Sequence, residues 1–109
     1  MNRILEEKFK GYCLVEVSGE SCANCISLMR PLKEISERLD GVKLIHIEAE
    51  TSSAELITAL DVEKVPAILL IRDGLIFAKC YGYQPEEILE LWIDAKLEEE
   101  RKKQITEDR

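Results

Sequence analysis

The chain has no long apolar run and no excess of basic residues, and its first residues are partly acidic; each of these features argues against a class of protein. Its longest apolar stretch, residues 65–71, is far shorter than the roughly 20 residues that cross a bilayer. The net charge is −7, whereas phosphate binding needs a basic surface. Residues 1–8 include acids where a secretion signal needs apolar residues. We therefore expect a cytoplasmic protein that binds neither nucleic acid nor membranes.

The chain has 109 residues, a length that suits one domain with one core. Segments with helical periodicity alternate along it with segments typical of β-strands. The predicted order is a helix at 2–9, a strand at 12–18, a helix from 22 or 23 to 39, a strand at 42–48, a helix from 52, strands at 67–71 and 75–81, and a last helix from 84. A strand–helix–strand unit joined to a strand–strand–helix unit predicts an α/β sandwich, with a mixed four-stranded sheet between helices.

Apolar residues at helical spacing predict the core faces of the two long helices. On the first they are Leu28, Met29, Leu32, Ile35 and Leu39. On the last they are Ile88, Leu89, Trp92, Ile93 and Leu97.

Three further signals concern helix ends and continuity. Pro31 should kink the first long helix because it lacks an N–H group. Ser52 and Glu55 match a capping box that opens the next helix. From Glu98 onward nearly every residue is charged, so we expect a solvated helix that frays into disorder.

Cys22 and Cys25 lie between a predicted strand and a predicted helix. This position places the Cys22 sulfur at a helix N-terminus, where free N–H groups and the macrodipole favour an anion. The thiolate is the form that attacks disulfides, and Cys25 is close enough to resolve the resulting mixed disulfide. The pattern predicts a small thiol–disulfide oxidoreductase.

A zinc site is the weaker alternative, because zinc needs two ligands beyond this cysteine pair. His46 is the only histidine; it lies in mid-strand, where a surface or packing role is expected. Cys13 lies at the far end of its strand from Cys22. We therefore expect no metal and no other cofactor.

Four features taken together resemble the thioredoxin family, and the resemblance covers residues 12–97. They are Cys22-Ala23-Asn24-Cys25 directly after a strand, Glu16 six residues before Cys22, Val65-Pro66 leading the third strand, and an Asp73-Gly74 hairpin followed by Gly82. The resemblance implies a single thioredoxin-like domain at 1–109, with an N-terminal helix at 1–11 and a charged tail at 98–109.

The chain also departs from the family pattern. Ser21 stands where the family usually has tryptophan, and Ala23-Asn24 replaces the usual Gly-Pro. Pro31 follows Cys25 by six residues instead of five. The first strand of the family has no counterpart, which implies four strands instead of five. These departures indicate a divergent thioredoxin-like protein.

The resemblance implies a role for each site residue. Cys22 is the expected nucleophile, and the more buried Cys25 resolves the mixed disulfide. Glu16 is a candidate proton acceptor for Cys25, directly or through water, unless the pleat of its strand points it at solvent. Pro66 is expected to be cis and to face the cysteines, leaving the Val65 backbone free to pair with an extended substrate. The expected substrate-contacting residues are Ser21, Ala23, Asn24, Val65, Pro66 and Gly82.

Two cysteines fall outside this motif. Cys13 and Cys80 are expected to be small buried hydrophobic residues, although Cys80 could be a third redox thiol or a glutathionylation site. The expected partners are disulfide-containing proteins and a thioredoxin reductase or glutathione for recycling, with the chain itself a monomer. A non-catalytic redox-sensing module and a metal-binding domain remain as alternative functions.

Overall fold

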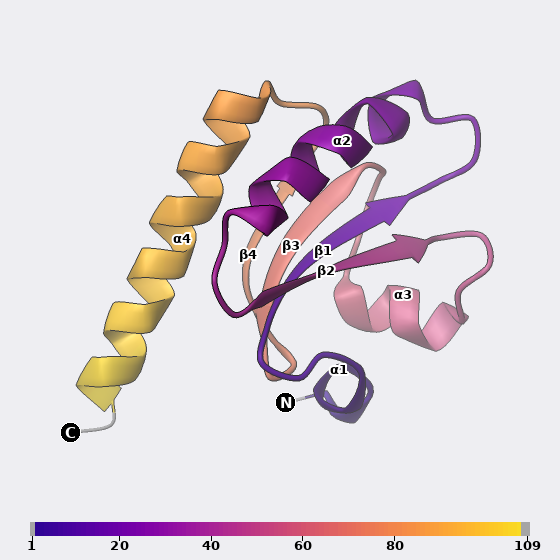
Figure 1. Ribbon diagram of the computed structural model, residues 1–109. Coiled ribbons are helices and arrows are strands. Elements are labelled where there is room, and N and C mark those ends of the chain that lie inside the picture. The colour runs from indigo at the N-terminus through magenta and orange to yellow at the C-terminus, as the bar shows by residue number, and fades with distance from the viewer. Residues whose placement is uncertain (1, 108–109) are drawn as a thin grey trace.

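The computed structural model describes residues 2–107 and contains the helices and strands in the predicted order (Figure 1). They are α1 (Arg3–Lys8), β1 (Tyr12–Ser18), α2 (Ala23–Glu37), β2 (Val42–Glu48), α3 (Ala54–Leu60), β3 (Ala67–Arg72), β4 (Leu75–Tyr81) and α4 (Glu86–Glu107). All strands lie where the extended patterns predicted them, with β3 one residue longer.

The strands form one mixed sheet in the order β2-β1-β3-β4. β1 runs parallel to β2 and antiparallel to β3, which is antiparallel to β4. The predicted mixed four-stranded sheet is therefore confirmed. Val17 pairs with Ala67, which pairs with Tyr81. The end of β1, the start of β3 and the end of β4 thus meet at one end of the sheet, the end where α2 begins (Figure 1).

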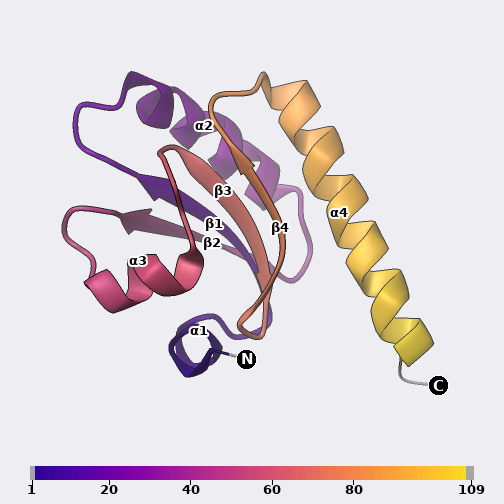
Figure 2. The same ribbon diagram turned by 180° about the vertical axis from the view of Figure 1, so that it is seen from behind.

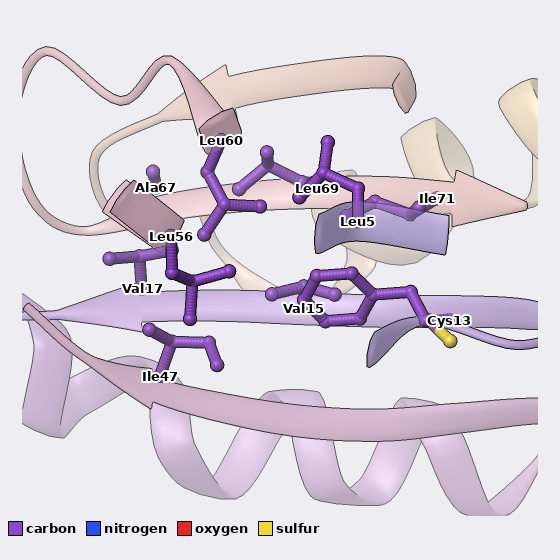
Figure 3. Packing of buried hydrophobic residues seen from close by; sticks show 11 residues of the cluster. Leu5, Cys13, Val15, Val17, Ile47, Leu56, Leu60, Ala67, Leu69 and Ile71 are labelled. Carbon is purple, nitrogen blue, oxygen red and sulfur yellow. The ribbon is translucent and has the colours of Figure 1, made fainter. Parts of the chain in front are cut away.

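Helices cover both faces of the sheet, because successive side chains of a strand point to opposite sides. The buried residues of the face under α1 and α3 are all apolar, and Figure 3 shows their packing at close range. Its buried residues are Leu5, Phe9, Cys13, Val15, Val17, Ile47, Leu56, Leu60, Ala67, Leu69 and Ile71. Figure 2 shows the sheet from the side of these two helices. The other face packs against α2 and α4, through Leu14, Leu28, Leu32, Ile35, Ile68, Leu70, Leu89, Ile93 and Leu97.

The predicted hairpin between β3 and β4 is present and fastens the N-terminal segment. Asp73 and Gly74 both have positive φ, 48° and 85°, as a tight two-residue hairpin turn requires. The Gly11 N–H donates to Asp73 Oδ1 at 2.7 Å, and the Asp73 N–H donates to the Gly11 carbonyl at 3.0 Å. A Cβ on Gly74 would lie 2.6 Å from the Glu6 backbone nitrogen, so α1 packs directly on the turn.

Two residues predicted for the core are exposed. Met29 and Ile88 each keep 55% of their surface accessible. Met29 lines a cavity beside Leu44 and His46 of β2, one outer strand of the sheet. Ile88 lines a cavity beside Cys80 of β4, the other outer strand. Beyond these strands the described sheet ends, so the apolar stripe of each helix is wider than the surface beneath it.

The sequence predicted Ser52 as the N-cap of α3, and this is wrong by one residue. Ser53 is the N-cap of α3, and its Oγ accepts a hydrogen bond from the Leu56 N–H at 3.1 Å. Ser52 instead donates its hydroxyl to the Glu48 carbonyl at 2.7 Å, at the end of β2.

The charged segment after Leu97 is helical to Glu107, where the sequence predicted fraying. Glu100 bonds Arg72 at 3.0 Å in a largely buried pair. Arg101 lies over the Tyr12 ring, with its guanidinium carbon 5.1 Å from the ring centroid. These contacts anchor the segment to the sheet. Among residues 2–107, neither this helix nor any other is long and apolar enough to cross a membrane.

Candidate active site

Cys22 is the N-cap of α2, and its sulfur faces the first turn of that helix. The Cys22 Sγ accepts a hydrogen bond from the Cys25 N–H at 3.2 Å, while the Cys22 carbonyl accepts one from the Ile26 N–H at 3.2 Å. The sulfur therefore occupies the place that a capping oxygen usually takes, among the unpaired N–H groups of a helix N-terminus. A negative charge on Cys22 is stabilised there by the N–H group and the helix dipole.

The two cysteines form a disulfide and differ in exposure. Their Cα atoms are 5.2 Å apart. Cys22 is partly exposed and Cys25 is 3% exposed, which agrees with the order of exposure that the sequence predicted. Ser21, Ala23 and Asn24 are exposed around them. An incoming thiol or disulfide therefore has access to Cys22 and not to Cys25.

The loop that leads from β1 to Cys22 is held by the segments after β2 and before β3. The Glu20 N–H donates to Glu50 Oε1 at 3.1 Å. A Cβ on Gly19 would lie 2.9 Å from Val65 Cγ2 and 3.2 Å from Glu50 Oε1, so a side chain there would displace these neighbours. Ser21 has φ of 53°, an uncommon value for a residue other than glycine. The backbone before Cys22 is thus fixed by close packing.

The Val65–Pro66 peptide bond is cis, as the sequence predicted. The Gly82 N–H donates to the Pro66 carbonyl at 2.9 Å, which joins the segment before β3 to the end of β4. Val65 packs against Gly19, three residues before Cys22. Through these contacts Val65, Pro66 and Gly82 belong to the same end of the sheet as the cysteine pair.

Glu16 is buried in the sheet face that α2 covers, with 3% of its surface exposed. This excludes the alternative that its strand points it at solvent. Its Oε2 accepts a hydrogen bond from the Ser18 hydroxyl. Its Oε1 lies 2.6 Å from His46 Nδ1 on β2. Both carboxylate oxygens therefore have polar partners, as a buried charged group requires.

His46 connects this buried carboxylate to the surface. Its side chain is 46% exposed, and its Nε2 lies 3.4 Å from Glu48 Oε2. Burial by itself lowers the pKa of His46, but the hydrogen bonds and charges of Glu16 and Glu48 outweigh that effect. The net result is a pKa above the usual histidine value.

The sequence predicted a surface or packing residue at His46, and its side chain is indeed 46% exposed, but the contact of its ring with Glu16 was not predicted. A signal was available in the spacing: Glu16 and His46 are both the fifth residue of a seven-residue strand. β1 and β2 pair in parallel from their first residues, Tyr12 with Val42, so Glu16 and His46 lie side by side. A cavity of about 190 Å³ adjoins them, lined also by Met29, Leu32, Lys33 and Leu44.

The two remaining cysteines are free thiols. Cys13 is buried in the face under α1 and α3, and burial raises the pKa of its thiol. Cys80 is partly buried beside α4, and burial raises its pKa to about 11. Both thiols are therefore poor nucleophiles at neutral pH. Within residues 2–107, no group of three or more His, Cys, Asp or Glu side chains is arranged to hold a metal ion.

Comparisons with known proteins agree with this geometry. The family model for thioredoxin matches residues 2–95. Thioredoxin C-2 from Corynebacterium nephridii is 28% identical over 85 residues, which are 77% of this chain and 78% of that protein. A cysteine desulfurase from Archaeoglobus fulgidus is 32% identical over 89 residues, 82% of this chain but only 21% of that enzyme.

A solved structure shows the same fold. A mutant thioredoxin from Halobacterium salinarum NRC-1 matches with a TM-score of 0.70 and 23% identity, over 80% of this chain and 75% of that one. The sheet order, the helix-capping cysteine pair and the family match agree with one another. The chain belongs to the thioredoxin family and carries the cysteine pair of a thiol–disulfide oxidoreductase.

Proposed function

We propose that the protein reduces disulfides in other proteins through Cys22 and Cys25. The Cys22 thiolate attacks a substrate disulfide, a mixed disulfide forms, and the first substrate thiolate leaves. Cys25 then loses its proton and attacks the Cys22 sulfur, which releases the second substrate thiolate. Two electrons have passed to the substrate, and the protein is left with the Cys22–Cys25 disulfide.

The observation that carries this proposal is the contrast between the two sulfurs. Cys22 Sγ accepts the Cys25 N–H at 3.2 Å at the start of α2 and is partly exposed, whereas Cys25 is 3% exposed. This supports Cys22 as the nucleophile and Cys25 as the resolving thiol. The burial of Glu16 on the face under α2 supports it as the proton acceptor for Cys25.

The rim around Cys22 is the proposed substrate site. Val65 lies outside β3 and packs on the loop before Cys22, which supports the proposal that its backbone pairs with an extended substrate. Gly82 and Pro66 support that segment through their 2.9 Å hydrogen bond. We add the exposed Ser21, Ala23 and Asn24 as contacts beside the nucleophile.

Recycling returns the pair to the dithiol form and requires two electrons from outside the protein. A thioredoxin reductase or glutathione, in a reducing compartment, is the proposed donor. The position of the Cys22–Cys25 equilibrium against glutathione decides the direction of electron flow, because each 30 mV corresponds to about 1.4 kcal/mol.

Reduction of insulin disulfides by dithiothreitol tests the proposal. The wild-type protein should accelerate the reaction, and Cys22→Ser should abolish the acceleration. Cys25→Ser should accumulate a mixed disulfide that mass spectrometry detects. Cys80→Ala, which removes a thiol outside the site, should retain full activity. An inactive wild-type protein, or full activity in Cys22→Ser, would contradict the proposal.

A redox-sensing interaction module is the second candidate. Ser21 in place of the usual tryptophan, and Ala23-Asn24 in place of Gly-Pro, change the surface that surrounds the nucleophile. A sensor would titrate reversibly against glutathione without turning over insulin. Finding both properties together would favour this second function over the first.

A further inference from the structure

A chain of polar groups crosses the two neighbouring strands β1 and β2 and ends at the surface. Ser18 donates to Glu16, Glu16 lies 2.6 Å from His46 Nδ1, and His46 Nε2 lies 3.4 Å from Glu48. Only 3% of Glu16 is exposed, against 46% of the His46 side chain. One imidazole therefore connects the buried carboxylate to solvent.

The position of Cys25 relative to this chain follows from α2. Met29 is one helical turn after Cys25, and it lines the same cavity as Glu16 and His46. The buried start of α2 and the polar chain thus share one face of the sheet. The cavity, about 190 Å³ in volume and lined by Glu16 and His46, is large enough to hold water.

The charged groups that face His46 come from three elements. They are Glu16 of β1, Glu48 of its own strand β2, and Lys33 of α2, which lines the cavity. A lysine is protonated near neutral pH and accepts no proton there. Carboxylates in general are much weaker bases than imidazole. Of these groups, His46 is therefore the one suited to take a proton from Glu16 at neutral pH.

We propose that His46 acts through Glu16 as the proton exit of the active site. The inference rests on the proposed function. When the Cys25 thiol is deprotonated, its proton passes to the Glu16 carboxylate, directly or through a water molecule. Glu16 passes a proton to Nδ1 of neutral His46, and the resulting imidazolium releases the Nε2 proton to solvent. The carboxylate and the neutral imidazole are restored, and no electrons move in these transfers.

The proposal predicts a specific pH dependence. Only the neutral imidazole accepts a proton, so protonated His46 blocks the exit. In the wild-type protein, release of the second substrate thiolate should accelerate as pH rises through the pKa of His46. Attack by Cys22, which precedes this step, should show no dependence on His46.

A single-turnover experiment measures the two steps separately. Prereduced protein is mixed with a peptide disulfide that carries a fluorophore and a quencher, and mixed-disulfide formation and release are followed between about pH 5.5 and 9. His46→Gln keeps an amide beside Glu16 but cannot exchange a proton. It should slow release by up to about 100-fold, the low end of proton-transfer effects, and lose the His46 step in the pH profile. Lys43→Gln, on the exposed opposite face of β2, is the matched control and should behave as wild type.

Chemical rescue separates proton transfer from a structural role. Added imidazole should restore release in His46→Ala, whereas pyrrole, which has the same ring shape but accepts no proton at neutral pH, should not. Equal rescue by both compounds would overturn the proposal, as would a wild-type release profile in His46→Gln. A wild-type protein that forms no mixed disulfide would contradict the proposed function itself. Normal formation with release insensitive to His46 would contradict only the inference.

Discussion

The two faces of the sheet receive alternate residues of the same strand and have different characters. To the face under α1 and α3, β1 contributes Cys13, Val15 and Val17, and the buried residues of that face are all apolar. To the face under α2 and α4 it contributes Leu14 and Glu16. The second face is also the one that the helix-capping cysteine pair adjoins. One face therefore stabilises the fold, and the other combines stability with polar chemistry.

The second face contains two buried carboxylates with different partners. Glu100 is paired with Arg72 at 3.0 Å, with side-chain exposures of 7% and 20%. Glu16 is paired with His46. A guanidinium stays charged at any pH a protein tolerates, whereas an imidazole gains and loses its proton near neutrality. Both carboxylates are buried, so the difference between them lies in the side chain that each one contacts. A carboxylate beside an arginine is suited to a structural role, and one beside a histidine is suited to proton exchange.

The largest expected effect is on the chemistry of the second face. Glu16→Gln removes the proposed proton acceptor and should slow the resolving step by about 10² to 10⁴-fold. Attack by Cys22 should proceed normally. Single-turnover release of substrate thiol measures this, and a release rate equal to that of the wild type would show that Glu16 is only structural.

A substitution on the face under α1 and α3 should reduce stability and leave the rate of disulfide reduction unchanged. Leu69 is fully buried there, and Leu69→Ala should lower the free energy of unfolding by about 2–5 kcal/mol, through lost burial and a cavity. The folded fraction should reduce disulfides at the wild-type rate. Denaturant titration with parallel activity measurements tests this, with the more exposed Leu75→Ala as the control. A rate loss in folded Leu69→Ala would remove the distinction between the faces.

Substitution of Glu100, the second buried carboxylate of the face under α2 and α4, should change stability and not the rate of disulfide reduction. Glu100→Gln breaks the pair with Arg72 and should lower the free energy of unfolding by about 1–3 kcal/mol, because it removes a charged hydrogen bond from a largely buried site. Disulfide reduction should be unaffected. Glu98→Gln, which removes an exposed pair with Lys102, should cost at most about 1 kcal/mol. Equal costs for the two variants would mean that burial of the Arg72 pair is energetically unimportant.

The smallest effect concerns pH and stability. Because the pKa of His46 is raised in the folded state, its protonation stabilises the fold below about pH 6.5, the unfolded value. That contribution should be lost as pH rises through the folded-state pKa. It should be small, because solvent screens a half-exposed pair. Denaturation midpoints on both sides of this window should differ less in His46→Gln than in wild type. An identical difference in the two proteins would contradict the ion pair.

The strands were predictable because their residues are β-branched and apolar and lie between turn residues. The faces of the helices were harder to predict. Met29 and Ile88 match the spacing of a core stripe, yet both are exposed because each lies over an outer strand. Helical periodicity gives the direction of a side chain and does not reveal how far the sheet extends beneath it.

The position of the cysteine pair could be predicted from the sequence. The surroundings of Glu16 could be predicted only in part. The position of Cys22 follows from local sequence, since a strand, a short loop and a helix suffice to define it. The burial of Glu16 depends on which face of β1 it occupies, and alternation alone left that open. The contact with His46 depends on the pairing of β1 with β2, which links residues 30 positions apart.

The place of β2 at the margin of the sheet has a consequence for how the protein works. Neighbouring strands lie about 4.8 Å apart, so the acid on β1 is a single strand's width from bulk water. A proton that leaves Glu16 across β2 passes through the imidazole ring of His46 and then enters solvent. Under the proposed mechanism, a further strand paired with β2 would lengthen that route and slow substrate release without touching the sulfur atoms.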